Sequence, residues 1–197
     1  MTSLDIDVDA HRKPDFPVKP FLFHRWSARA MTGEALTRDE LMTLFEAARW
    51  APSCFNDQPW RFLYALPDSP SWPLMMDLLL PGNRVWGERA GALVMLLSTR
   101  NVASTGKPSP SHSFDAGAAW QNFALQAYAM KLVAHGALGF DHERARRELN
   151  IPAGLNIETM IIVGKPGNRA DLAEELQARE QPSARKPLAE LVREGGF

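Results

Sequence analysis

The sequence predicts a single α/β or α+β domain in which helices cover both faces of a sheet. Helical and strand patterns alternate along the chain, as is typical of layered folds that combine both kinds of element. Residues 90–97 form an apolar run of strand length, which indicates a strand covered on both faces. The 197 residues match the size of one large domain, and neither an internal repeat nor a shift in composition divides them.

The chain begins with a polar stretch. Residues 1–20 contain three prolines, so we expect an N-terminal arm there and the folded domain over residues 21–197. Thr37 and Glu40 have the spacing of a capping box, and apolar residues follow at helical intervals. A helix is therefore expected to begin at Thr37 and to end before Pro52, because a residue that precedes proline avoids the helical conformation.

The remaining elements follow from apolar periodicity and from turn residues. In chain order we expect a strand over 60–64, a turn over 67–70, a short helix over 72–80 stopped by Pro81 and Gly82, a loop over 101–112, a long helix over 113–134, a helix from the N-cap Asp141 to Asn150, a strand over 157–163, a charged helix over 170–180 and a C-terminal arm over 181–197. The helix over 113–134 is apolar nearly all round, which indicates burial either by its own sheet or by a second copy of the chain.

Composition excludes several classes of protein and site. The formal net charge is −1, from 22 Lys and Arg against 23 Asp and Glu, which gives no support to nucleic-acid binding. Cys54 is the only cysteine, so the sequence excludes an internal disulfide and a multi-cysteine zinc site. The N-terminus does not resemble a signal peptide, and residues 114–133 are too polar to span a membrane. We therefore expect a cytoplasmic protein with neither a membrane nor a nucleic acid as partner.

Several common site motifs are missing. The five histidines show no HExxH spacing, so no metal site is indicated. His135 is interpreted as a packed or capping residue at the end of the helix over 113–134. The chain contains no GxGxxG, no P-loop and no Gly-x-Ser-x-Gly, which argues against a Rossmann site, a P-loop nucleotide site and a hydrolase nucleophile.

A basic segment offers the groups that bind a phosphate. Arg25, Ser27 and Arg29 alternate, so in an extended segment all three point to one side. Two guanidinium groups and a hydroxyl suit a phosphate, although for this pattern alone a solvated basic strand near the surface is the more ordinary use. Arg185 and Lys186, far along the chain, are candidates for a second contact to the same anion.

The connection between the first predicted helix and the strand over 60–64 is a candidate ligand loop. Pro52 and Asn56 stiffen it, and Ser53, Asn56 and Gln58 supply hydrogen-bond donors and acceptors. An amide side chain matches the edge of a ring with neighbouring C=O and N–H groups. Ordinary turn chemistry is the alternative. Cys54 is interpreted as a packed residue, because nothing in the sequence suggests that it is an activated nucleophile.

Taken together, these segments resemble the FMN-dependent nitroreductase family from about residue 23 to residue 197. The resemblance rests on Arg25-Trp-Ser-Ala-Arg29, Ala48-Arg-Trp-Ala-Pro-Ser-Cys-Phe-Asn-Asp-Gln-Pro-Trp60, Asn83 seven residues before Ala90, Asp115-Ala-Gly-Ala-Ala-Trp-Gln-Asn122, Leu138-Gly-Phe-Asp141 and Arg185-Lys-Pro-Leu188. No single motif is specific, but their order and spacing over most of the chain are.

The resemblance implies a fold and an assembly. It implies an α+β domain of three α/β/α layers, with a central, mostly antiparallel sheet flanked by helices. It also implies a homodimer that binds two FMN molecules at the subunit interface. The C-terminal arm, residues 181–197, would then pack on the partner subunit or fold back on its own.

The resemblance also assigns residues to the flavin. It implies that the phosphate and ribityl chain are contacted by Arg25, Ser27 and Arg185, with Lys186, and the pyrimidine side by Arg29 and Asn83. It implies that the backbone of Leu138 and Gly139 lies near N5. It also implies that the other subunit supplies Pro52, Ser53, Cys54 and Asn56; Trp26 and Gln58 are included with the segments that contain them. One departure is Trp86, which stands where many relatives have a basic residue. An aromatic surface would then replace a cationic contact. Leu138 is a second departure from the family pattern, because some relatives have an acidic residue there.

The predicted function is an oxidoreductase in which FMN takes electrons from NAD(P)H and, in a ping-pong cycle, passes them to a small-molecule acceptor. Nitroaromatics, quinones and related conjugated electrophiles are the expected acceptors. Since the flavin performs the chemistry, no protein acid or base is assigned. Two alternatives stay open: another flavin reaction on the same fold, such as dehalogenation, flavin breakdown or oxidation of a small substrate, and a flavin- or nucleotide-binding module without turnover.

Overall fold

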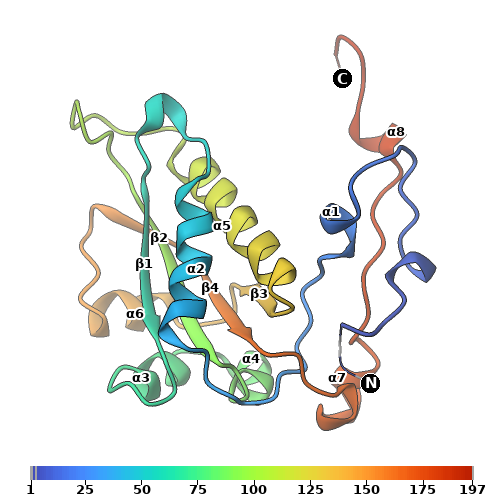
Figure 1. Ribbon diagram of the computed structural model, residues 1–197. Coiled ribbons are helices and arrows are strands. Elements are labelled where there is room, and N and C mark those ends of the chain that lie inside the picture. The colour runs from blue at the N-terminus through green and yellow to red at the C-terminus, as the bar shows by residue number, and fades with distance from the viewer. Residues whose placement is uncertain (1, 3, 197) are drawn as a thin grey trace.

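A four-stranded antiparallel sheet forms the centre of the molecule. The computed structural model of the chain describes residue 2 and residues 4–196. Its strands are β1 (Trp60–Ala65), β2 (Ala92–Thr99), β3 (Val133–Ala137) and β4 (Leu155–Gly164), in the spatial order β1-β2-β4-β3, and every neighbouring pair is antiparallel (Figure 1). The expectation of a mostly antiparallel central sheet is therefore confirmed.

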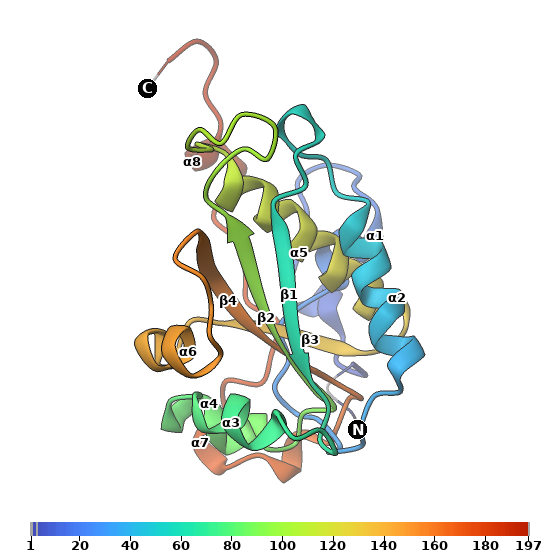
Figure 2. The same cartoon turned by 90° about the vertical axis from the view of Figure 1, so that its left-hand side faces the viewer.

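Helices cover both faces of this sheet. One layer consists of α2 (Arg38–Arg49) and α5 (His112–Ala129), and the other contains α3 (Trp72–Asp77), α4 (Pro81–Gly87) and α6 (His142–Glu148) (Figure 2). Two separate clusters of buried apolar side chains lie between these layers and the sheet. The molecule thus has the three α/β/α layers that were expected.

Strand β2 shows how the sequence determines this arrangement. Leu93 and Met95 belong to one apolar cluster, whereas Val94 and Leu96 belong to the other. All four side chains are at most 1% exposed. Successive residues of a strand point to opposite faces, so an uninterrupted apolar run places side chains in both cores at once.

The helix expected after Thr37 is α2, and it begins where the capping box predicts. The Thr37 side chain accepts a hydrogen bond from the Glu40 backbone N–H, and the Glu40 carboxylate accepts one from the Thr37 backbone N–H. Helix α2 ends at Arg49, with Trp50 as its C-cap and Pro52 two residues further on. The N-cap Asp141 of α6 is likewise confirmed, because its side chain accepts from the Arg144 N–H.

The prediction of one helix over 113–134 is wrong at its C-terminal end. Helix α5 ends at Ala129, Lys131 has a φ of 57°, and β3 begins at Val133. The apolar residues Val133 and Ala134 belong to this strand, which was not expected from the sequence. A continuous apolar run does not distinguish a buried helix from a buried strand, so periodicity gave no warning of the change.

Two other boundaries differ from expectation. Pro81 does not simply stop a helix over 72–80: α3 ends at Asp77, and Pro81 is the first residue of α4, a position where its missing N–H costs nothing. The charged stretch over 170–180 forms a 3₁₀ turn, Arg169–Asp171, and a short helix α7, Glu174–Gln177, in place of one helix.

The two terminal segments lie side by side at one edge of the molecule (Figure 1). The N-terminal arm contains a 3₁₀ turn, Val8–Ala10, and leads into α1 (Pro20–His24). The C-terminal segment is largely extended and contains the short helix α8 (Leu188–Leu191). The Arg12 side chain joins them by donating to the carbonyl of Ser183 at 2.8 Å. Among the described helices, none has both the length and the apolar character needed to cross a membrane.

Candidate functional site

A cavity of about 350 Å³ lies where the segment after α1 meets β3 and the C-terminal segment. Its lining consists of Arg12, Arg25, Trp26, Ser27, Arg29, His135, Arg179, Gln181, Ser183 and Arg185. Five of the candidate residues identified from sequence are in this set: Arg25, Trp26, Ser27, Arg29 and Arg185. The fold therefore brings the two basic segments together across about 150 residues of chain.

The alternation in residues 25–29 is reproduced in three dimensions. Trp26 and Ala28 are buried, at 5% and 0% exposure, whereas Arg25, Ser27 and Arg29 are partly exposed. One side of this extended segment packs into the core, so the other side presents its polar groups to the cavity. Nη1 of Arg25 and Oγ of Ser27 are 3.5 Å apart, close enough to contact one ligand atom together.

The cavity concentrates positive charge. Five arginines and no carboxylate are among the described residues that line it. Burial lowers the pKa of Arg25, and the nearby Arg185 lowers it further. Nε of Arg25 is buried and has no hydrogen-bond partner within the described part of the chain. Buried donors and like charges in such an arrangement are stabilised by an anion that accepts several hydrogen bonds, and a phosphate is such an anion.

Glu180 stabilises Arg29, one of the arginines that line the cavity. Its carboxylate is fully buried and accepts hydrogen bonds from the backbone N–H groups of Arg29 and Ala30, both at 2.8 Å. Its Oε2 lies 3.8 Å from Nη1 of Arg29. Burial lowers the pKa of Arg29, and Glu180 opposes this shift by favouring the charged guanidinium. Glu180 thus fixes both the backbone and the charge of Arg29.

Asn83 and Gly139 form a second pair of candidate residues brought into contact. Nδ2 of Asn83, on α4, donates to the Gly139 carbonyl at 3.2 Å, just beyond the end of β3. A Cβ at position 139 would lie 2.5 Å from that nitrogen, so only glycine allows this approach. Leu138 beside it is 69% exposed. An exposed residue, Leu138, and a partly exposed glycine therefore lie next to a fixed amide.

The candidate loop over 52–58 lies elsewhere. It forms a 3₁₀ turn, Cys54–Asn56, with positive φ angles at Phe55, Asn56 and Gln58. Oγ of Ser53 accepts from the Gln58 N–H at 3.0 Å, and the Cys54 N–H donates to Asp115 at 3.3 Å. Cys54 is exposed, so its interpretation as a packed residue is wrong: the turn carries it at the surface and not into the core. In Figure 1 this turn lies at the top of β1, on the opposite side from the terminal segments. Within one chain, Pro52, Ser53, Cys54, Asn56 and Gln58 do not join the arginine cavity.

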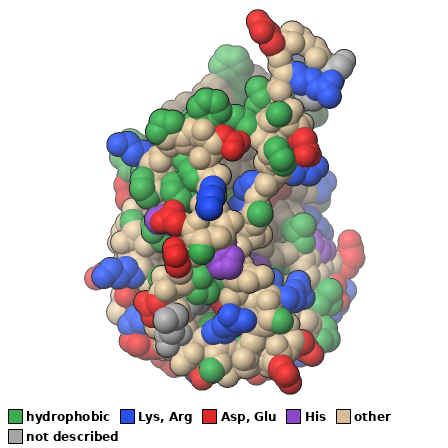
Figure 3. All heavy atoms as spheres, turned by 90° about the vertical axis from the view of Figure 1, so that its right-hand side faces the viewer, with side chains coloured by type: hydrophobic (Ala, Val, Ile, Leu, Met, Phe, Trp, Pro, Cys, Tyr) green, Lys and Arg blue, Asp and Glu red, His purple; other side chains and the backbone are tan. Residues whose placement is uncertain are grey.

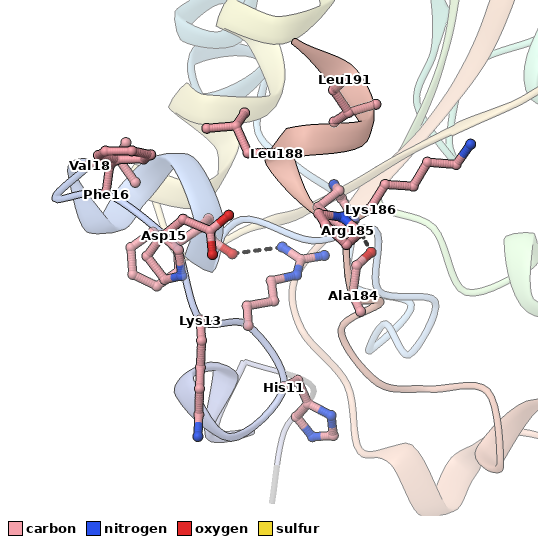
Figure 4. Close-up of a pocket in the computed structure, with 14 residues that line it drawn as sticks. His11, Lys13, Asp15, Phe16, Val18, Ala184, Arg185, Lys186, Leu188 and Leu191 are labelled. Carbon is pink, nitrogen blue, oxygen red and sulfur yellow. Dashed lines mark hydrogen bonds between the residues drawn. The ribbon is translucent and has the colours of Figure 1, made fainter. Parts of the chain in front are cut away.

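Lys186 lines a neighbouring groove. This groove, of about 520 Å³, lies between the N-terminal arm and the C-terminal segment, and Arg12 and Arg185 border both it and the arginine cavity. In Figure 4 Lys186 extends away from Arg185, so the two basic residues diverge. Figure 3 shows the same side of the molecule, with hydrophobic side chains gathered over its upper part.

Comparisons with known proteins show which family the chain belongs to. The model of the nitroreductase family matches residues 22–69, which include Arg25 and the 52–58 loop. A solved oxidoreductase that contains FMN is 41% identical, with a TM-score of 0.91 over 94% of this chain and 96% of that one. The chain belongs to the nitroreductase family.

Two further structures share the fold of this nitroreductase-family protein. One, from Desulfovibrio desulfuricans, is described as a candidate nitroreductase in complex with FMN; it is 29% identical, with a TM-score of 0.72 over 93% of this chain and 99% of that one. Another, described as a candidate NADH oxidase from Clostridium acetobutylicum, is 23% identical, with a TM-score of 0.68 over 90% and 99%. No curated protein sequence matches the chain.

Trp86 does not present the aromatic surface that the sequence suggested for this member of the nitroreductase family. Its side chain is 1% exposed and packs in the core, with its ring 4.8 Å from that of His135. Trp86 therefore packs against His135, which lines the cavity. A ring buried in this way offers no aromatic surface in place of a cationic contact.

His135 is packed, as expected, but it lies in β3 and not at a helix end. Its Nδ1–H donates to the Ala28 carbonyl at 3.2 Å. Burial lowers its pKa to about 4, and the charges of Arg29 and Arg25 contribute to this shift. The imidazole is therefore neutral at pH 7 and adds no further charge to the cavity.

This pKa predicts a loss of stability in acid. The folded-state pKa lies below that of an exposed histidine, so between pH 6.5 and 4 the unfolded chain binds a proton that the folded chain does not. For the ligand-free protein we expect His135 to lower the free energy of unfolding by roughly 3 kcal/mol as pH falls from 7 to 4. Urea unfolding of the parent and of His135→Gln at both pH values checks this. The variant should lose less stability over the interval, and equal losses would contradict the assignment.

Three residues of the site were not predicted from the sequence: Arg12 and Arg179, which line the cavity, and Glu180, which contacts Arg29. Each lies in a segment whose composition looks like a solvated arm or surface helix. Glu180 meets Arg29 across about 150 positions, and Arg12 meets Ser183 across 171. No local spacing relates residues so far apart, so a single sequence offered no signal for them.

Proposed function

We propose that the chain is an FMN-dependent oxidoreductase that takes electrons from NAD(P)H and passes them to a nitroaromatic, a quinone or a related conjugated electrophile. The observation that carries this proposal is the cavity, whose described lining has five arginines and no carboxylate. It includes the buried Nε of Arg25, which has no partner among the residues that the structure describes. Family membership, and the FMN in two of the similar solved structures described above, support the phosphate of FMN as that anion.

The residues present fit FMN. Arg25, Ser27 and Arg185 would hold its phosphate, and Arg29 and Asn83 would face the pyrimidine side of the ring. The partly exposed Gly139 would lie against the ring edge, where the absence of a side chain permits close approach. Bound FMN would supply a two-electron carrier, which accepts electrons from the nicotinamide and returns them to the acceptor.

The protein itself would contribute orientation and charge. Arg29, held by Glu180, places a fixed positive charge where negative charge develops on reduction. His135 stays neutral, so this stabilisation comes from the arginines alone. We assign no side chain as proton donor or acceptor.

We further propose that two copies of the chain complete the site. The loop over 52–58 lies away from the cavity of its own chain, so it would contact the flavin of a partner. Large apolar side chains near this loop are exposed: Trp50 at 71%, Phe55 at 98% and Phe114 at 83%. Large exposed apolar side chains of this kind favour association when they gather into one patch. The C-terminal arm, where Leu191 is 54% exposed, would pack on that partner. Sedimentation measurements should give a dimer, and a monomer at micromolar concentration would contradict this part of the proposal.

Purified protein should be yellow and should release FMN on heating. With NADH or NADPH it should reduce menadione or a nitroaromatic. Double-reciprocal plots of initial rate against one substrate, at several fixed concentrations of the other, should give parallel lines, as in a ping-pong cycle. Colourless protein with no affinity for added FMN would overturn the proposal. Flavin-loaded protein that consumes neither nicotinamide would keep the cofactor but favour another flavin reaction.

A further inference from the structure

Arg12 occupies an unusual position for a residue of a polar N-terminal arm. Its side chain belongs to the buried set, at 8% exposure. Nε donates to the Ser183 carbonyl at 2.8 Å, and Nη1 donates to the carbonyls of Phe23 and Arg25 at 2.6 and 2.8 Å. One guanidinium group therefore joins three segments: the arm, the end of α1 and the C-terminal segment.

Two of these acceptors belong to the segments that present the other arginines of the cavity. Arg25 supplies one carbonyl itself, and Ser183 lies two residues before Arg185. Within the described residues, the guanidinium of Arg185 donates short-range bonds in its own segment, to Ser183 and to the Ala184 carbonyl. The bond from Arg12 to Ser183 thus ties the Arg185 segment to the backbone of Arg25.

Arg12 also adds charge to the site. Its three acceptors are neutral carbonyls, and it lines the cavity beside Arg25 and Arg185. Burial lowers its pKa, and the charges of Arg185 and Arg25 lower it further. Three guanidinium groups held this close repel one another, so the arrangement is favourable chiefly when an anion lies between them.

We infer that Arg12 is a positioning residue for phosphate binding, which sets the spacing between Arg25 and Arg185 and makes the N-terminal arm part of the cofactor site. This inference rests on the proposed function. Arginine is suited to the task because its planar, forked donors reach acceptors in several directions at once, whereas a lysine ammonium is a compact point charge.

The test measures the affinity of the full-length apoprotein for FMN and for riboflavin, which lacks the phosphate. Arg12→Ala should weaken FMN binding about tenfold or more and riboflavin binding much less. Arg12→Lys keeps the charge but cannot span the three carbonyls, so it should also weaken FMN binding, by about threefold or more. Both variants should exchange amide hydrogens faster in residues 181–187 than the parent.

Lys13→Ala is the matched control. Lys13 is adjacent in sequence and lines the neighbouring groove, and in Figure 4 its side chain points away from Arg185. FMN affinity in this variant should stay within twofold of the parent. A purely structural role for Arg12 would lower FMN and riboflavin affinity equally, and that result overturns the inference. If Arg12→Ala does not fold, parent-like FMN affinity in Arg12→Lys overturns it as well. Loss of FMN in Arg25→Ala but not in either Arg12 variant would leave the proposed function standing without this inference.

Discussion

Replacing Arg25 by alanine is expected to weaken FMN binding by about 3 kcal/mol, which is on the order of 100-fold. The guanidinium lies in a partly desolvated cavity, where Nε has no hydrogen-bond partner in the described part of the chain and Nη1 is near the Ser27 hydroxyl. A phosphate there would accept charge-assisted hydrogen bonds that alanine cannot supply. Titration of the apoprotein, followed by quenching of flavin fluorescence, measures the change.

Arg38→Ala is the control for the charge that is removed. Arg38 is exposed at the start of α2, on the helical layer opposite α4. Both substitutions lower the net charge by one unit, so a long-range electrostatic effect would weaken binding in both. We expect parent-like affinity in Arg38→Ala. Equal affinity in Arg25→Ala and the parent would remove Arg25 from the site.

The difference between what was predicted and what was missed follows from the range of the interactions. Alternation of Arg25, Ser27 and Arg29 is local, and an extended backbone converts it directly into one polar side. The capping box at Thr37 is local too. Both features were predicted correctly, because three to five neighbouring residues determine them.

Features that depend on the tertiary fold were not predictable in this way. Strand β3 was assigned to a helix because its apolar residues continue those of α5, and only the turn at Lys131 separates the two. The same error placed His135 at a helix end. Trp86 was expected at a surface, but the helix that buries it begins at Pro81, a residue interpreted as a stop signal. In each case a long-range contact decides between two locally acceptable conformations.

Glu180→Ala is the second substitution with a large expected effect, and it acts on stability. The carboxylate is fully buried and is the acceptor for two backbone N–H groups, those of Arg29 and Ala30. Alanine would leave both donors without that acceptor and would remove the negative partner of Arg29. We expect the free energy of unfolding to fall by roughly 3–5 kcal/mol, since breaking one side of a buried ion pair leaves an uncompensated charge. Urea unfolding of the ligand-free protein measures this.

Glu180→Gln separates the two contributions. Glutamine keeps an acceptor oxygen for the backbone N–H groups but removes the charge. The free energy of unfolding of Glu180→Gln should therefore lie between those of the parent and of Glu180→Ala. Glu175→Gln, at an exposed position, should change stability by less than about 0.5 kcal/mol. Because glutamine removes a negative charge beside the arginines, this less stable variant should bind inorganic phosphate at least as tightly as the parent. A weaker affinity would mean that the carboxylate's main contribution is to orient the cavity and not to hold the fold together.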